Sequence, residues 1–321
     1  MVKTANSYLK STGYPKPFLK WAGGKTQLLE EIHKRLPENI KKTRKDGKKG
    51  IIDKYFEPFV GGGAVFFCLT SCYDIRHAYL GDTNRDLILT YNIIKYKPHD
   101  LIDKLKDLEN KYKHEKSTPK ERKKLFKDKR DDFNIMHDVN PYGLSDEHVT
   151  IASLMIFLNK TCFNGLYRVN KNNKFNVPFA NPKNPLICDE KNIIAVSKKL
   201  KGVELFVGDY SKSIVGMDKK SLVYFDPPYR PINGKKSFEG YSKSDFNDTH
   251  QKKLAKFCKR INKREVKFIL SNSDPKNYDK TDNFFDELYD DFNVKRICAK
   301  RFINSKGDKR GPITELLVSN F

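Results

Sequence analysis

The sequence has no apolar run of the length that crosses a membrane. A membrane-spanning helix needs about 20 consecutive apolar residues. The densest apolar stretches here, 64–69 and 154–158, have the length of a strand or of part of a buried helix. The first 21 residues also lack the hydrophobic core and small-residue cleavage site of a secretory signal. These absences exclude a membrane protein and lead us to expect a cytoplasmic location.

Cysteine and histidine are few and scattered. The six cysteines lie at positions 68, 72, 162, 188, 258 and 298, without the density of a disulfide framework or the paired spacing of a zinc site. The seven histidines form no ligand cluster either. We therefore expect neither a disulfide scaffold nor a structural zinc, and we assign no metal to the protein.

Acidic residues are in short supply: 40 Asp and Glu stand against 63 Lys and Arg, which gives a formal net charge of +23. This excess attracts polyanions, so nucleic acid is the first partner to consider and an anionic membrane the second. A lysine-rich genome composition would also explain many of these lysines, so charge alone does not identify the partner. Hydrophobic residues make up 38% of the chain, enough for a sizeable core.

Short apolar runs predict a parallel sheet. Residues 203–207, 222–225 and 266–270 are β-branched or aromatic, and the polar residues Asp209, Asp226 and Ser271 follow them. This pattern is typical of parallel strands with functional groups at their C-terminal ends. Residues 41–50 predict an exposed basic loop. Residues 95–132 are mostly charged with sparse apolar positions, a pattern that predicts exposed amphipathic helices. We predict an α/β domain formed by 1–92 and 196–321, with an inserted domain at 93–195.

A glycine-rich turn follows a predicted strand at 55–60. The segment that begins at Phe59 reads FVGGGA, and its glycines would let the backbone pass close to a ligand. Gly61 and Gly63 match the start of a dinucleotide fingerprint, but Phe66 stands where the third glycine should be. Asp82 lies 21 residues after Gly61, where an acid would accept hydrogen bonds from ribose hydroxyls. A nucleoside without a pyrophosphate fits both facts, and so does an ordinary tight turn with a helix-capping Asp.

The segment KWAGGKT at 20–26 contains the GKT of a phosphate-binding loop, but it fails that pattern. A Walker A loop requires glycine where this chain has Leu19, and no strand precedes the segment. Phosphate transfer is therefore not expected. Two interpretations stay open: Trp21 and Lys25 cover a bound ligand, or Trp21 anchors the start of a helix.

The segment YFDPPY at 224–229 follows another predicted strand. Its two prolines fix an extended, rigid turn and remove two N–H donors. Asp226 and the carbonyl of Pro227 can accept both N–H hydrogens of an exocyclic amine, while Tyr229 stacks on the attached ring. A purely structural loop would explain the prolines but neither the Asp nor the Tyr. We therefore predict a site for the amino group of a planar base.

Four segments of the chain resemble the Dam-type, class α, DNA adenine-N6 methyltransferases. They read FLKWAGGK, FEPFVGGGAVFF, YFDPPY and RGPITELLVSNF, in that family's order, and the resemblance covers nearly the whole chain. It is nearest to the restriction-modification and Dam enzymes that methylate GATC. The fold it implies is α/β: a Rossmann-like mixed sheet of the S-adenosylmethionine-dependent methyltransferases, with an inserted helical and hairpin target-recognition domain.

The resemblance also implies site residues. The Trp and Lys of the first segment, the Asp after the second strand and the Asp of DPPY would contact S-adenosylmethionine. The cofactor-binding residues that we expect are Trp21, Lys25, Phe59, Gly61, Gly63, Asp82 and Asp226, and the catalytic residues are Asp226, Pro227 and Tyr229.

Residues 159–180 resemble the family's recognition hairpin. In that family an aromatic residue inserts into the duplex, an Arg reads a guanine, and Leu and Pro touch neighbouring bases. The matching positions are Phe163, Asn164, Leu166, Arg168 and Pro178, with Phe163 standing where Tyr is commonest. Arg168 can bond guanine O6 and N7 together, and Leu166 can pack on a thymine methyl group.

The expected reaction is direct methyl transfer to an adenine that is flipped out of duplex DNA, because N6 cannot be reached in the stack. No covalent intermediate is needed, and the sequence has no Pro-Cys pair of the kind that cytosine-C5 enzymes use. A cytosine-N4 methyltransferase, an RNA adenine methyltransferase and a non-catalytic basic DNA-binding protein remain alternatives. We expect a monomer, and a paired restriction endonuclease is a possible partner.

Overall fold

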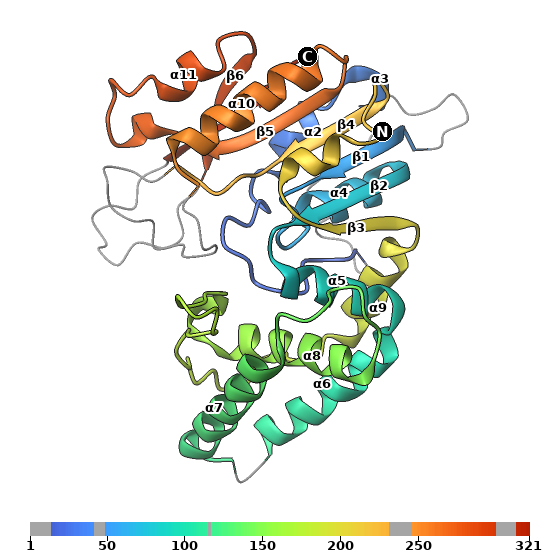
Figure 1. The fold of residues 1–321 in the computed structure, drawn as a ribbon, viewed down its shortest axis with the longest axis vertical. Coiled ribbons are helices and arrows are strands. Elements are labelled where there is room, and N and C mark those ends of the chain that lie inside the picture. Colours follow the sequence, from blue (N-terminus) through green and yellow to red (C-terminus); the bar gives the residue numbers. More distant parts are fainter. Residues whose placement is uncertain (1–13, 42–48, 115–116, 231–245, 300–312) are drawn as a thin grey trace.

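A twisted sheet forms the upper half of the molecule, above a group of helices (Figure 1). The computed structural model describes residues 14–41, 49–114, 117–230, 246–299 and 313–321. Within them the sheet has seven strands in the order β3-β2-β1-β4-β5-β7-β6. The strands are β1 (Ile51–Glu57), β2 (Asp74–Asp82), β3 (Val203–Val207), β4 (Ser221–Phe225), β5 (Lys267–Ser273), β6 (Asn293–Ala299) and β7 (Ile313–Ser319). Most of the basic loop predicted at 41–50, and residues 310–312 of the last motif, lie outside the described residues.

The first five strands of the sequence pair in parallel, and β7 runs antiparallel between β5 and β6. The strands predicted at 203–207, 222–225 and 266–270 are β3, β4 and β5, and the predicted α/β fold with a mixed sheet is confirmed. From β1 the chain first builds β2 and β3 on one side, and then returns to build β4 and β5 on the other side of β1. Ligands of α/β sheets bind at such a switch point, beyond the C-terminal ends of the strands.

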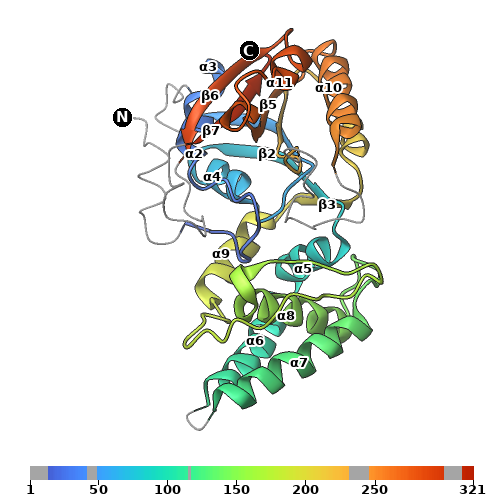
Figure 2. The ribbon, with the colours of Figure 1, turned by 90° about the vertical axis from the view of Figure 1, so that its left-hand side faces the viewer.

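Alternating side chains of the strands divide the core into two layers. On β4, Val223 and Phe225 pack on one side, whereas Leu222 and Tyr224 pack on the other. Helices α10 (Asp248–Asn262) and α11 (Phe284–Leu288) cover the first side, and α2 (Leu29–Lys34) and α4 (Ala64–Cys72) cover the second (Figure 2). Helix α3 (Glu38–Lys41) follows α2. Both faces of the central strand are therefore buried, as its unbroken apolar sequence predicts.

The remaining helices stack below the sheet in Figure 1. They are α5 (Arg85–Tyr96), α6 (Pro98–Lys113), α7 (Pro119–Met136), α8 (Asp146–Thr161) and α9 (Glu190–Leu200). Helix α8 is buried along most of its length because α5, α6 and α7 all pack against it. The predicted boundaries after 92 and 195 fall inside α5 and α9, so continuous helices join the sheet to the insert. The division into domains remains a prediction.

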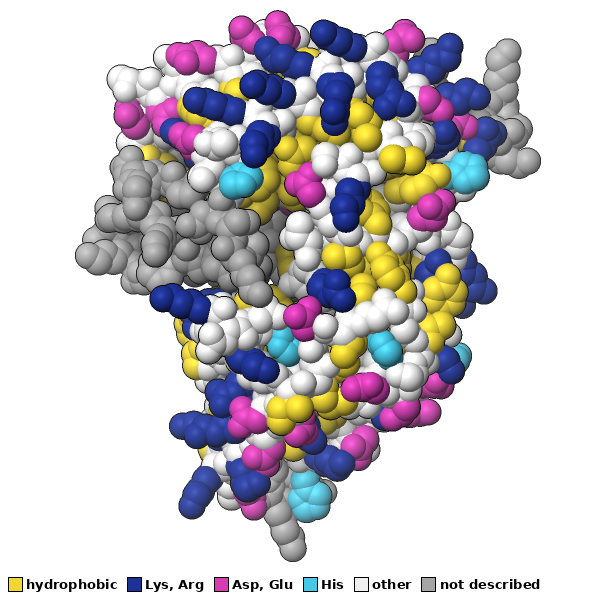
Figure 3. Space-filling view, in the orientation of Figure 1, with side chains coloured by type: hydrophobic (Ala, Val, Ile, Leu, Met, Phe, Trp, Pro, Cys, Tyr) yellow, Lys and Arg dark blue, Asp and Glu magenta, His cyan; other side chains and the backbone are white. Residues whose placement is uncertain are grey.

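The charged stretch of the insert forms the helices that its sequence predicts. Helix α7 begins with a capping box in which Thr118 and Glu121 bond each other's backbone N–H. Many lysines of α6 and α7 pair with acids one turn away, namely Lys111–Asp107, Lys113–Glu109, Lys124–Asp128 and Lys129–Asp132. Figure 3 accordingly shows basic and acidic side chains intermixed over this lower part. Much of its positive charge is therefore locally balanced on a solvated surface. None of the described helices is long and apolar enough to cross a membrane.

Candidate active site

A cavity of about 800 Å³ opens at the C-terminal ends of β1, β2 and β4. Its walls come from the loop at 17–26, the glycine-rich turn, the residues that follow β2, and the DPPY segment. The expected cofactor-binding and catalytic residues all line it: Trp21, Lys25, Phe59, Gly61, Gly63, Asp82, Asp226, Pro227 and Tyr229. Its volume lies in the upper part of the range of about 300–1,000 Å³ that is usual for small-molecule sites. The fold thus brings four separated segments around one cavity.

The glycine-rich turn requires glycine at two positions. Gly61 and Gly63 have φ angles of +45° and +72°, in the region that favours glycine. A Cβ atom on Gly61 would lie 2.6 Å from Cδ1 of Trp21, and one on Gly63 would lie 2.6 Å from the hydroxyl of Tyr91. The turn therefore places bare backbone against the Trp21 ring at the cavity wall.

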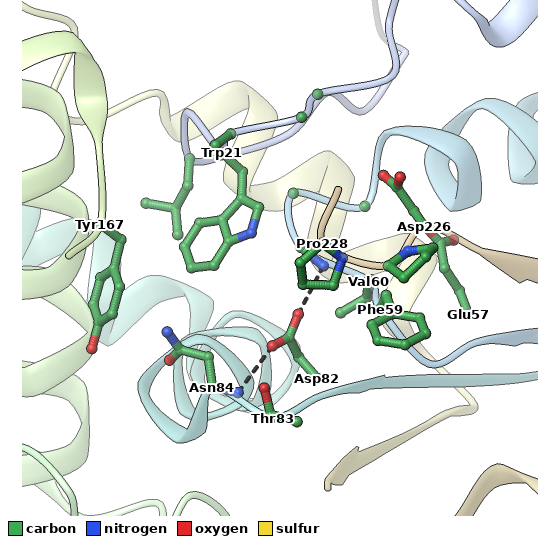
Figure 4. Close-up of a pocket in the computed structure, with 18 of the residues that line it drawn as sticks. Trp21, Glu57, Phe59, Val60, Asp82, Thr83, Asn84, Tyr167, Asp226 and Pro228 are labelled. Atoms are coloured by element: carbon green, nitrogen blue, oxygen red, sulfur yellow. Dashed lines mark hydrogen bonds between the residues drawn. The ribbon is translucent and has the colours of Figure 1, made fainter. Parts of the chain in front are cut away.

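Asp82 ends β2 and faces this turn. Its carboxylate accepts hydrogen bonds from the backbone N–H of Gly61 at 3.2 Å and of Asn84 at 2.9 Å (Figure 4). Burial raises its pKa to about 6, although both backbone donors oppose the shift. Asn84 in turn caps α5, because its side chain accepts from the N–H of Leu87. Asp82 is therefore a fixed acceptor that ionises close to neutral pH.

Lys25 and Asp226 form an ion pair in the wall of the cavity. The Lys25 ammonium lies 2.7 Å from Oδ1 of Asp226 and also donates to the carbonyl of Gly23 at 2.6 Å. The Lys25 side chain is only 4% exposed, whereas Asp226 is 20% exposed. Ser271, within β5, donates to the same Oδ1 at 2.9 Å. Burial raises the pKa of Asp226, and the charge of Lys25 opposes that rise.

Tyr229 lies beside this ion pair. The Lys25 ammonium is 4.6 Å from the centroid of its ring, and the Tyr229 hydroxyl donates to Oε2 of Glu315 on β7 at 2.6 Å. Of the two prolines between Asp226 and Tyr229, Pro227 is buried and Pro228 is exposed. The DPPY segment is thus held at both ends, by Lys25 and Ser271 at Asp226 and by Glu315 at Tyr229.

The expected recognition residues form a separate group on an irregular hairpin. Isolated bridges join Cys162 to Phe179 and Val169 to Phe175, and the N–H of Phe163 donates to the Pro178 carbonyl at 2.8 Å. The ring of Phe163 is 53% exposed. These contacts fold the segment into an irregular hairpin, with Leu166 packed partly into the core and Asn164 at a φ of +55° in a short 3₁₀ turn.

Arg168 is held across the hairpin. Its Nε donates to Oδ1 of Asn176 at 2.8 Å, and its Nη2 donates to the carbonyl of the same residue at 3.2 Å. None of the five expected recognition residues lines the cavity, although their neighbours Tyr167, Val169 and Asn173 do. The recognition hairpin therefore borders the cavity without placing its expected DNA-reading side chains in it.

Comparison with known proteins identifies the family. The profile of the D12 class N6 adenine-specific DNA methyltransferases matches residues 21–303. The chain belongs to this family. It is therefore a DNA methyltransferase that acts on adenine N6, as the resemblance in the sequence implies, and the alternatives of a non-catalytic protein and of a cytosine-N4 enzyme fall away.

Relatives of this D12-class methyltransferase match over almost its whole length. The Type II methyltransferase M.MjaIII of Methanocaldococcus jannaschii is 47% identical over 308 residues, which cover 95% of this chain and 99% of the relative. The Type II methyltransferase M1.LlaDCHI of Lactococcus lactis subsp. cremoris is 34% identical over 308 residues, covering 95% of each chain. The DNA adenine methylase of Haemophilus influenzae is 32% identical over 319 residues, covering 99% and 98%.

The structure adds Glu57 to the lining of the methyltransferase cavity. Glu57 ends β1, is 2% exposed, and accepts a hydrogen bond of 2.7 Å from the hydroxyl of Tyr55. Burial, with a contribution from the charge of Asp226, raises its pKa to about 8. Burial thus favours the neutral form of the Glu57 carboxyl group, which reduces the negative charge beside Asp226. The available signal in the sequence was an acid at the end of a strand, directly before the glycine-rich turn.

Tyr167 is the second residue of the methyltransferase cavity that sequence reasoning missed. Its ring stacks on Trp21, with the ring centroids 5.7 Å apart and the planes at 27°. Figure 4 shows the two rings facing each other at one end of the cavity. Tyr167 precedes Arg168 directly, so its place in the recognition segment concealed its part in the pocket.

Proposed function

We propose that the methyl donor is S-adenosylmethionine and that it binds in the cavity described above. The juxtaposition of Asp82, the glycine-rich turn and the Lys25–Asp226 pair around one cavity carries the proposal. Asp82 can accept from the ribose hydroxyls, and Gly61 leaves bare backbone where a Cβ would push the Trp21 ring. When bound, this cofactor supplies an electrophilic methyl group on its sulfonium. The residues present therefore fit a nucleoside with a charged tail and no pyrophosphate.

The DPPY segment binds the target adenine. Oδ1 of Asp226 already accepts from Lys25 and Ser271, so Oδ2 is the oxygen that we assign to the adenine amine. The carbonyl of Pro227 accepts the second N–H, which draws the nitrogen lone pair out of conjugation with the ring. Tyr229 stacks on the base with the ring face that Lys25 leaves open. Positioning of the amine accounts for most of the catalysis in this scheme.

Adenine reaches this site by leaving the duplex, because its N6 is otherwise enclosed in the stack. The exposed ring of Phe163 is suited to fill the gap that the base leaves. Arg168 uses two of its five N–H donors on Asn176, which leaves three for the O6 and N7 atoms of a guanine. Leu166 and Pro178 contact the neighbouring bases, and Asn164 lies at the turn between Phe163 and Leu166. We assign GATC as the target.

The wider setting of the enzyme is also a proposal. Two of the similar proteins are named as Type II methyltransferases, which supports pairing with a restriction endonuclease. We propose that the enzyme acts as a monomer on double-stranded DNA in the cytoplasm, with residues 93–195 as its target-recognition domain.

The chemistry is tested with Asp226→Ala. This variant should lose methyl transfer from labelled S-adenosylmethionine while it retains most DNA affinity, since phosphate contacts dominate that affinity. Asp218→Ala is the matched control, because Asp218 is an exposed acid that pairs with Lys54 away from the cavity. Near-normal turnover of purified Asp226→Ala would contradict the assignment.

The target is tested with GATC duplexes against every single-base variant, at two salt concentrations. Arg168→Ala should cost about 1–3 kcal/mol on the cognate site and relax discrimination at one base pair only. Arg122→Ala serves as the control, since Arg122 lies on α7 and bonds Ser117 and Asn181. An equal loss on all duplexes would make Arg168 a phosphate contact. Methylation of another sequence by the wild type would refute GATC and leave the adenine chemistry standing.

A further inference from the structure

Tyr167 belongs to the recognition hairpin by sequence and to the cofactor cavity by position. It precedes Arg168, yet it lines the cavity and is only 6% exposed. Its ring lies against Trp21, and the Trp21 ring also lies against the bare backbone of Gly61. A residue of the DNA-reading segment thus supports one of the residues expected to bind the cofactor.

A buried hydrogen bond fixes the far end of the Tyr167 ring. The Tyr167 hydroxyl donates to Oδ2 of Asp86 at 2.6 Å, and Nδ1 of His137, at the end of α7, lies 3.1 Å from the same oxygen. Asp86 is 5% exposed in the first turn of α5. That turn begins at Asn84, which donates its N–H to Asp82. Tyr167 therefore contacts Trp21 in one of the segments to which we assign the cofactor, and Asp86 in the helix that begins directly after another, at Asp82.

A second set of hydrogen bonds joins the recognition hairpin to the loop that carries Trp21. The side chain of Asn159, at the end of α8, accepts from the N–H of Lys20 at 2.9 Å and donates to the Lys20 carbonyl at 2.9 Å. It also donates to the carbonyl of Gly165 at 2.7 Å, and it is 3% exposed. Asn159 thereby links the backbone two residues before Tyr167 to the backbone directly before Trp21.

We propose that Tyr167 is a positioning residue that couples DNA reading to cofactor binding. This inference rests on the proposed function, in which Arg168 reads a base and Trp21 and Asp82 hold the cofactor. When Arg168 binds its guanine, the adjoining backbone fixes the position of the Tyr167 ring. The ring in turn fixes the positions of Trp21 and of the first turn of α5. Cognate DNA then tightens cofactor binding, and the cofactor tightens cognate DNA by the same factor, because coupling between binding sites is reciprocal.

The coupling is measured by calorimetry with S-adenosylhomocysteine as the probe. Its Kd is determined without DNA, with the duplex that the wild type methylates best, and with a duplex changed at one base pair. In the wild type the first duplex should tighten binding about five-fold or more, and the changed duplex should not. The coupling ratio is the Kd for the probe without DNA divided by its Kd with the cognate duplex. Tyr167→Leu should bring this ratio to about one. Tyr167→Phe keeps the stacked ring but loses the bond to Asp86, so its ratio should be intermediate.

Tyr112→Phe is the matched control. Tyr112 is buried in α6 of the same insert, and its hydroxyl donates to the Pro182 carbonyl at 2.8 Å, away from the cavity. This variant should keep the wild-type ratio, which separates coupling from the general loss of a buried hydroxyl. The Kd for the cognate duplex, measured with and without the probe, should change by the same factor as the Kd for the probe.

The possible failures are distinct. If the wild type does not bind S-adenosylhomocysteine at all, the cofactor assignment fails and this inference fails with it. If the wild type binds the probe but cognate DNA leaves its Kd unchanged, only the coupling is refuted. A wild-type coupling ratio in both Tyr167 variants would also refute the coupling. So would variants that bind the probe more weakly by the same factor with and without DNA, because Tyr167 would then only line the pocket. If Tyr167→Leu does not fold, Tyr167→Phe decides.

Discussion

Cofactor affinity should fall as the pH drops through 6, because Asp82 then takes up a proton. Burial raises the pKa of Asp82 to about 6 in the protein without cofactor. A ribose hydroxyl donates better to a carboxylate than to a neutral carboxyl group, so binding favours the ionised form. One pH unit below this pKa only about one carboxyl in eleven is ionised. The Kd for S-adenosylhomocysteine at pH 5 should therefore be about ten-fold higher than its plateau above pH 7.

Calorimetric titrations from pH 5 to pH 8 test this with two comparison variants. Asp82→Ala should bind the probe about 10- to 100-fold more weakly at pH 7.5 and should lose the step near pH 6. Asp279→Ala should keep the step, because Asp279 is an exposed aspartate whose partner is Thr281. A flat wild-type profile, or the same slope in Asp82→Ala, would refute the role of Asp82 and move it to a structural one.

Three further substitutions test other parts of the cavity. Gly61→Ala should weaken probe binding about ten-fold beyond Gly202→Ala, which adds a Cβ at a similar φ in open space; equal affinities would show that the contact with the indole is unimportant. Lys25→Met should move the activity maximum to higher pH, because the pKa of Asp226 rises further without its cation; an unmoved kcat profile would count against the ion pair. Tyr229→Ala should lose stacking worth about 1–3 kcal/mol, while Tyr229→Phe keeps most of the turnover rate. If the two variants turned over at similar rates, the ring would not hold the base.

The parts of the site that the sequence predicts are those determined locally. The glycine-rich turn and the DPPY segment each follow a short apolar run, and the ends of parallel strands meet at one edge of a sheet. These two facts are enough to bring Gly61, Asp82 and Asp226 to the same edge of the sheet. The mixed sheet itself follows less directly, because β6 and β7 pair antiparallel at the edge and the sequence pattern indicated only parallel strands.

The parts that the sequence does not predict depend on contacts between distant segments. Tyr167 enters the cavity only because it meets Trp21 from the first segment and Asp86 from α5. The raised pKa of Glu57 depends on complete burial, and a charged residue at the end of a strand does not predict such burial. The predicted domain boundaries follow a change in composition, whereas α5 and α9 continue through that change.

The way Asn159 is bonded has a consequence for building chimeric enzymes. Its three hydrogen bonds at Lys20 and Gly165 all go to backbone atoms, so they do not depend on which side chains stand at those positions. A recognition segment grafted from a relative after residue 159 would keep this joint as long as the host retains its Asn. The graft should carry glycine at position 165, where a Cβ would lie 2.5 Å from Cδ of Lys20. Under the function that we propose, such a graft would exchange target specificity as a module.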